Sequence, residues 1–96
     1  MMYSVDVMRA DAKRAITAVI RVVVQGDDTQ ATIKVDVFTP DRQGDAFVNG
    51  VRCMHGGTST GKVDMTTGKM SGIIPATLSP DVADAILHGL KFISNK

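Results

Sequence analysis

The first part of the chain alternates between apolar and polar side chains in the way that half-buried β-strands do. From Met2 to Met8, the side chains of Tyr3, Val5 and Val7 fall on one face, and the polar side chains of this segment fall on the other. Residues 31 to 38 alternate in the same way. Both segments are therefore predicted to be strands of a sheet with one buried face.

The segment from Ala15 to Gln25 fits two patterns. Its apolar positions form a stripe along a helix that begins after Asp11, and they also fit one face of a strand. Most residues from 16 to 24 are Val or Ile, whose branched side chains lose rotamer freedom in a helix. We therefore favour a strand, and a helix over residues 11 to 24 is the alternative.

Turn-forming residues connect these segments into hairpins. Residues 26 to 28, Gly-Asp-Asp, predict a turn in a long hairpin over residues 15 to 38. The pair Asn49-Gly50 tolerates positive φ and predicts a tight second hairpin over residues 47 to 52. The sheet is therefore expected to be a meander of antiparallel strands.

Two further segments are rich in glycine and threonine. Residues 55 to 60, HGGTST, are predicted to form a flexible loop between strands. Residues 63 to 70 predict a third hairpin, in which Gly68 takes a left-handed position at the end of the turn.

The C-terminal part of the chain predicts a helix that runs to about Ile93. Ser79 is a good N-cap, Pro80 suits the first helical position, and Asp81 complements the positive end of the helix dipole. The predicted fold class is α+β, with an antiparallel hairpin meander packed on one face by this helix. A chain of 96 residues forms one such domain, residues 1 to 96.

Composition and charge exclude several classes of protein. With 44% hydrophobic and 22% charged residues, the chain is globular rather than disordered. A net charge of +1 provides no general attraction to nucleic acid or to anionic lipid. Aromatic residues make up 4% of the chain, so there are few platforms on which bases could stack.

The N-terminal third has the outline of a signal peptide, with basic residues from Arg9 to Arg14 before an apolar run from Ala15 to Val24. However, Arg21 interrupts the run, no small-residue cleavage site follows it, and it is too short to cross a bilayer. The single cysteine suits a reducing compartment. We expect a cytoplasmic protein without a membrane partner.

Residues 56 to 62, GGTSTGK, match the GxxxxGK part of a phosphate-binding P-loop. A P-loop also needs Ser or Thr after the lysine to ligate Mg²⁺, and it opens a helix. Val63 stands at that position, and strand-like alternation follows it. We predict that no nucleotide binds here, while Lys62 and exposed amides of the segment are kept as a weaker anion contact.

Cys53, His55 and His88 are the soft metal ligands of the chain. A structural zinc site needs four ligands in spaced pairs, so we predict no metal site. A catalytic pair of Cys53 and His88 is a further hypothesis, but nothing in the sequence places the two side chains together. We therefore predict no catalytic residue and no cofactor.

Basic residues gather in a segment whose only acid is Asp11. The candidate contacts for an anion or a nucleic acid are Arg9, Lys13, Arg14, Arg21 and Lys62. No aromatic residues alternate with them, so an ordinary solvated surface is the simpler interpretation.

The predicted helix is more apolar than one sheet contact requires. At about 100° per residue its apolar arc spans about 220°, whereas packing on a sheet needs little more than about 100°. Leu87 and Phe92 lie on the two flanks. Gly89 costs about 1 kcal/mol relative to Ala inside a helix, and the close approach of another backbone would explain its presence. We predict that Leu87, Gly89 and Phe92 contact a second copy or another protein. The alternative is that loops such as residues 55 to 60 cover the flanks.

No motif in the sequence defines an active site, and a thin domain of sheet and helix has little room for a cleft. The first hypothesis is a non-enzymatic protein-binding domain, homo-oligomeric, that acts as an inhibitor, adaptor or assembly subunit. The alternative is a nucleic-acid-binding β-sheet domain that uses the N-terminal basic residues and Lys62 with weak affinity. A small enzyme using Cys53 or His55 is the third hypothesis. Small domains of this kind are common on phages and other mobile elements, although no residue indicates that origin.

Overall fold

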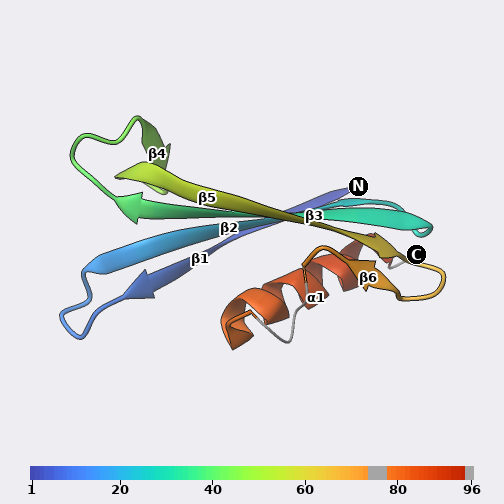
Figure 1. Cartoon of the computed structure of the whole chain (residues 1–96). Coiled ribbons are helices and arrows are strands. Elements are labelled where there is room, and N and C mark those ends of the chain that lie inside the picture. The colour runs from blue at the N-terminus through green and yellow to red at the C-terminus, as the bar shows by residue number, and fades with distance from the viewer. Residues whose placement is uncertain (74–77, 95–96) are drawn as a thin grey trace.

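An antiparallel sheet and one C-terminal helix make up the fold, which confirms the predicted α+β class (Figure 1). The structure is a computed structural model that describes residues 1–73 and 78–94. Its elements are β1 (Met2–Ala10), β2 (Ile16–Gly26), β3 (Gln30–Pro40), β4 (Ala46–Val48), β5 (Val51–Asp64), β6 (Met70–Ser71) and α1 (Pro80–Ser94).

The strands pair in the order β1-β2-β3-β5-β4, and β6 pairs with the C-terminal end of β5. Every pairing is antiparallel, so the predicted meander and its long hairpin of β2 and β3 are confirmed. Residues 16 to 26 form β2, and the helix considered for residues 11 to 24 is not present. Asp11 instead closes the β1–β2 turn, because its carboxylate accepts hydrogen bonds from the amides of Lys13 and Ala15 at 2.8 and 3.0 Å.

The predicted turn residues have the expected backbone geometry. Asn49 and Gly50 connect β4 to β5 with φ angles of 52° and 78°. Gly68 lies between β5 and β6 with a φ of 76°. The short second and third hairpins are therefore confirmed.

Residues 55 to 60 were expected to be a flexible loop, and this prediction is wrong. They belong to β5 (Val51–Asp64), which pairs with β3 from Cys53 to Asp64. Val37 pairs with Gly57 but Phe38 pairs with His55, so one extra residue forms a β-bulge in β5. Gly57 has a φ of 152°, a conformation that glycine tolerates best. The glycines therefore allow a bulge inside a long strand.

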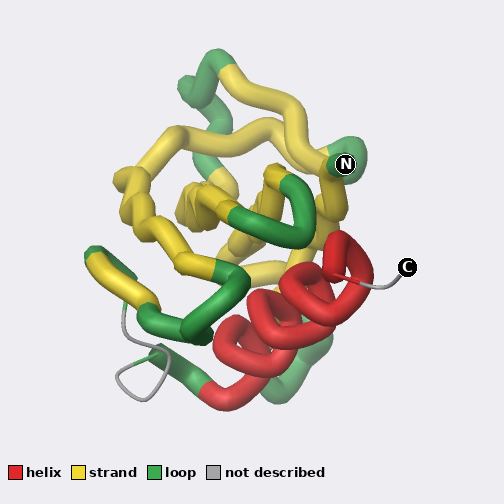
Figure 2. The backbone as a smooth tube through the Cα atoms, turned by 90° about the vertical axis from the view of Figure 1, so that its right-hand side faces the viewer, coloured by secondary structure: helices red, strands yellow, loops and turns green. Residues whose placement is uncertain are grey.

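The helix packs on one face of the sheet, against β1 and β2 (Figure 1). Figure 2 shows that the sheet curls strongly around its long axis. The main core joins the sheet to α1, and its fully buried members include Val22, Val24, Ile33 and Ile86. Val19 lies on the opposite face of β2, because side chains alternate along a strand, and it packs there with Val48 and Cys53.

The helix begins where the sequence predicted. The amide of Ala83 donates to the carbonyl of Ser79 at 3.0 Å, and Pro80 occupies the first helical position. Among the residues that the structure describes, no helix has the length and apolarity needed to cross a membrane.

Candidate binding surface at the free edge of the sheet

β1 lies at the edge of the sheet and pairs there with β2. Met1 and Gly26 exchange both backbone hydrogen bonds, each 3.0 Å long. In an antiparallel ladder such pairs alternate with pairs that are not hydrogen-bonded. From Met1 to the bulge after Arg9, the odd-numbered residues therefore bond to β2. The even-numbered residues direct their amide and carbonyl groups away from β2: Met2, Ser4, Asp6 and Met8.

These outward-directed groups are not paired with another strand in the parts of the chain that the structure describes, residues 1–73 and 78–94. Natural edge strands are commonly protected from further pairing by lysine, proline or unpaired charge. β1 contains neither Lys nor Pro. It therefore presents a free ladder of backbone donors and acceptors.

Both charged residues of β1 are neutralised within the chain. Arg21 of β2 donates two hydrogen bonds to the carboxylate of Asp6, at 2.9 and 3.1 Å. Arg9 forms an ion pair with Asp81 at the start of α1, with 2.9 Å between Nη2 and Oδ1, and it also bonds to the Ser79 hydroxyl. A strand that pairs with β1 would therefore meet no uncompensated charge.

Asp6 is also bonded to the β4–β5 turn. The side-chain amide of Asn49 donates to Asp6 Oδ2 at 2.8 Å. The hydrogen bond from Arg21 lowers the pKa of Asp6, and it outweighs the opposite effect of burial. The carboxylate therefore stays charged and well bonded at neutral pH, and the turn reaches β1 through a side chain.

Apolar side chains follow the same edge. Met2 and Met8 are 60% and 44% exposed. On the other face of β1, the half-buried Tyr3 ring lies 5.8 Å from the ring of Phe92, which is 46% exposed. The edge of β1 and the neighbouring flank of α1 together form the candidate binding surface.

The structure separates the three residues that were predicted to form an interface on the helix. Leu87 and Phe92 are both exposed, but five positions of a helix place them about 140° apart, on opposite flanks. Phe92 adjoins β1 through Tyr3, whereas Leu87 faces away from that edge. Residues 55 to 60 lie in β5 and leave both side chains exposed.

Gly89 has a different role from the one predicted. It is buried, and a Cβ atom there would lie 2.6 Å from Val24 Cγ2 and 2.7 Å from Tyr3 Cδ1. The absence of a side chain therefore allows α1 to approach the chain's own sheet. This replaces the prediction that Gly89 admits another molecule, while the interface roles of Leu87 and Phe92 stay predictions.

The predicted basic residues do not form one surface. Arg9 and Arg21 are ion-paired, as described above. Lys13 and Arg14 are exposed in the β1–β2 turn. Lys62 is near the opposite end of the sheet, because its cross-strand neighbours lie close to the β2–β3 turn.

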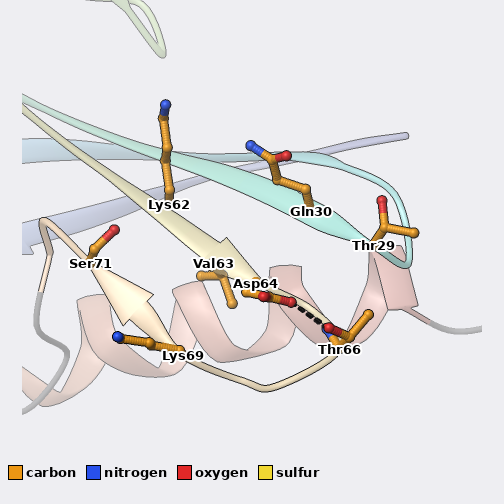
Figure 3. Close-up of a pocket in the computed structure, with 8 residues that line it drawn as sticks. All are labelled: Thr29, Gln30, Lys62, Val63, Asp64, Thr66, Lys69 and Ser71. Atoms are coloured by element: carbon orange, nitrogen blue, oxygen red, sulfur yellow. Dashed lines mark hydrogen bonds between the residues drawn. The ribbon is translucent and has the colours of Figure 1, made fainter.

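Lys62 lines two adjoining open cavities of about 600 and 380 Å³, and Ser71 also lines both. Lys69 contributes to the larger cavity, which is shown in Figure 3, and Lys34 contributes to the smaller one. In Figure 3 the side chains of Lys62 and Lys69 extend in different directions rather than toward a common point. This surface offers scattered amino and hydroxyl groups rather than a built anion site.

A polar cluster joins β3 and β5 on the face away from α1. Nε2 of His55 lies 2.9 Å from Asp36 Oδ1 and 3.1 Å from the Thr58 hydroxyl, which itself donates to Asp36 Oδ1 at 2.5 Å. Burial by itself raises the pKa of Asp36, but the hydrogen bonds from Thr58 and His55 outweigh it and the net effect is a lowered pKa. The cluster therefore holds a charged carboxylate in the sheet.

This cluster lacks the geometry of a catalytic triad. In a triad the histidine contacts the carboxylate with one ring nitrogen and the hydroxyl with the other. Here His55 uses Nε2 for both contacts, and the Thr58 hydroxyl gives its proton to Asp36. No proton relay from the hydroxyl through the ring is formed.

The other candidate soft ligands lie apart from this cluster. Cys53 is fully buried in the smaller core, and His88 is exposed on α1. Within residues 1–73 and 78–94, no three His, Cys, Asp or Glu side chains are placed to hold a metal ion.

No known protein family matches the sequence, and no similar protein is found among curated proteins or solved structures. The surfaces of the molecule are therefore the basis for inferring its function.

The sequence analysis did not predict the free edge of β1, although residues 2 to 8 carry one signal of it, namely strand alternation without Lys or Pro. The position of this strand at the edge depends on the order of strands in the sheet.

Proposed function

We propose that this chain is a non-enzymatic protein-binding domain, acting as an inhibitor, adaptor or assembly subunit, and that it receives its partner along β1. The observation that carries the proposal is the nine-residue edge strand with outward-directed amides and with both of its charges paired. A partner in extended conformation would continue the sheet by backbone hydrogen bonds, each worth about 0.5–1.5 kcal/mol. Exposed apolar side chains beside the edge would add buried area.

The geometry of the titratable groups supports a role without catalysis. The His55 cluster provides no hydroxyl nucleophile with its own base, and Cys53 is buried away from solvent. The cavities beside Lys62 are open, and the described residues that line them do not bring an acid, a base and a nucleophile together. These features favour recognition of a partner over chemistry on a substrate.

The test is selection of peptides from a displayed random library by the immobilised full chain. Ser4 directs its amide outward, so Ser4→Pro removes a donor from the free edge without removing a β1–β2 hydrogen bond. We expect the wild type and the control Ser4→Ala to enrich peptides with strand-like alternation and Ser4→Pro to enrich none. Equal enrichment by all three proteins would show that β1 is not the binding element.

A nucleic-acid-binding role is the second candidate, and one observation favours it. Lys34, Lys62 and Lys69 line adjoining cavities together with Thr and Ser hydroxyl groups. Arg9 and Arg21 are already ion-paired, and Nζ of Lys34 lies 3.8 Å from Asp36 Oδ2, so three of the candidate cations already have a carboxylate partner. We expect at most weak binding of oligonucleotides that is lost by about 0.2 M salt. Binding that persists above that concentration and is abolished by Lys62→Ala would favour this role over the first.

A further inference from the structure

The sequence and the hydrogen-bond pattern of β1 also indicate which partner fits its edge. Resting on the proposed function above, we infer that the partner is β1 of a second copy of this chain. The two strands would pair antiparallel about a two-fold axis that passes through Val5.

The segment from Met2 to Met8 is self-complementary about Val5. Reversing it places each residue opposite one of similar kind: Met2 opposite Met8, Tyr3 opposite Val7, Ser4 opposite Asp6, and Val5 opposite itself. The Ser4 hydroxyl would face the carboxylate of Asp6 from the second copy, while apolar side chains face apolar ones. Such cross-strand pairs stabilise antiparallel sheets.

The backbone selects the same register. Hydrogen bonds across a new strand pair need outward-directed groups on both strands, and in β1 these belong to the even-numbered residues. If the two-fold axis passes through a residue, each even-numbered residue faces an even-numbered residue of the second copy, and both direct their backbone groups toward each other. If the axis passes between two residues, each even-numbered residue faces an odd-numbered one, and the hydrogen bonds between the two strands cannot form.

Two other residue-centred registers are less favourable. An axis through Asp6 would place its carboxylate directly opposite that of the second copy, and like charges in that position are destabilising. An axis through Ser4 would place the apolar side chain of Met2 opposite the carboxylate of Asp6 from the second copy, so neither side chain would face one of similar kind. The Val5 axis avoids both faults.

The helix agrees with this arrangement. A two-fold axis perpendicular to the sheet keeps both α1 helices on the same face. In each copy α1 packs over both β1 and β2, against Tyr3 and Val24. Neighbouring strands are about 4.8 Å apart, so the two helices would be separated by about two strand spacings. The resulting distance of about 10 Å is normal for two packed helices. The flank of α1 that carries Phe92 is the one beside β1, so it would be covered by the second copy.

The other free edge of the sheet is a poorer site. Among the residues that the structure describes, none pairs with the outer side of β5 between the residues that pair with β4 and those that pair with β6. That stretch contains the bulge and Gly57, which interrupt the regular spacing of donors and acceptors. β1 is regular from Met2 to Arg9.

Sedimentation of the full chain over a concentration series tests the dimer. The wild type and Ser4→Ala should form a dimer, and Ser4→Pro should raise the dissociation constant about 100-fold, about tenfold for each of the two symmetry-related hydrogen bonds lost. Circular dichroism of the wild type and of both variants shows whether the fold is retained. A dimer whose dissociation constant is unchanged in folded Ser4→Pro would overturn the inference.

Disulfide trapping tests the register independently of proline. Facing residues in a non-hydrogen-bonded antiparallel pair have Cα atoms about 4.5 Å apart, within the range of a disulfide. With oxidised glutathione as oxidant, Val5→Cys should yield a covalent dimer, while Val7→Cys, which faces Tyr3 of the second copy, should not. The wild type is the background control, because Cys53 is buried. Cross-linking through position 7 but not through position 5 would refute the Val5 axis.

The two proposals fail in different ways. A wild type that stays monomeric at every concentration, and that gives no Val5→Cys dimer, ends the inference about the second copy. If that protein still selects peptides and Ser4→Pro does not, the protein-binding function stands. If neither dimer nor peptide binding depends on Ser4, both proposals are wrong.

Discussion

Replacing Gly89 by alanine decides whether helix propensity or packing against the sheet controls the stability of α1. In an exposed helix this substitution stabilises by about 1 kcal/mol, because alanine loses less backbone entropy on folding. Gly89 is instead buried, and the new methyl group would lie 2.6 Å from Val24 Cγ2 and 2.7 Å from Tyr3 Cδ1. Favourable carbon contacts need about 3.5–4.0 Å, so the helix and sheet must separate by roughly 1 Å.

The magnitude follows from these opposing effects. The Tyr3 ring can move, but Val24 is fully buried in the main core and its Cβ would also be 3.0 Å from the new atom. Overpacking of a core costs about 1–3 kcal/mol, and the upper part of that range applies where a side chain has no room to retreat. After subtraction of the propensity gain, we expect Gly89→Ala to lower the free energy of unfolding by about 1–2 kcal/mol. The melting temperature should fall by about 4–8 °C for each kcal/mol.

Urea denaturation at one fixed protein concentration measures the effect, with a double-mutant cycle as control. Val24→Ala removes the methyl groups that the new side chain would meet, so Gly89→Ala should cost less in that background, with a coupling of about 1 kcal/mol or more. A stabilisation of about 1 kcal/mol by Gly89→Ala in the wild-type background would refute the reasoning, because it is the result expected from helix propensity without a packing constraint.

Three further predictions concern titration and access. The Thr29 hydroxyl and neighbouring amides lower the pKa of Asp27 to about 2, so Thr29→Val should raise this pKa in carboxyl NMR titrations, and an unchanged value would contradict the assignment. The hydrogen bond from Arg21 lowers the pKa of Asp6 in the folded state. The contribution of this ion pair to the free energy of unfolding is therefore present above 3.8, the ordinary pKa of the carboxyl group, and it is lost as the pH falls through the lowered pKa of the folded state. The loss of unfolding free energy in Arg21→Met should therefore be largest at neutral pH and shrink in acid, and a difference that does not vary with pH would count against the ion pair. Cys53 is fully buried, so a thiol reagent should label it no faster than the core opens, and immediate labelling of the native protein would contradict its placement.

The sequence by itself determined the elements whose signals are local. Alternation fixed β1 and β3, because side chains of a strand point to opposite faces at every step. The Asn49-Gly50 pair fixed the β4–β5 turn, because these residues tolerate positive φ at low cost. Ser79 and Pro80 fixed the start of α1, because a helix terminus is satisfied by residues next to it in the chain.

Tertiary structure decided the features that depend on distant partners. Residues 55 to 60 have the composition of a loop, yet β3 supplies their backbone hydrogen bonds and makes them part of β5. Arg21 belongs to a basic segment in the sequence, but the register of β1 on β2 places it on Asp6.

Gly89 and the edge of β1 show the same dependence. The sequence indicates that another part of a protein lies close to the backbone at Gly89. The structure shows that this part is the chain's own sheet, because a Cβ atom at Gly89 would meet Val24 of β2 and Tyr3 of β1. The order of the strands that the structure describes leaves β1 at the edge of the sheet, with one side of its backbone directed away from β2. The side-chain pattern of residues 2 to 8, on which the proposed pairing with a second copy rests, is a property of the sequence. The order in which strands pair is a property of the folded chain.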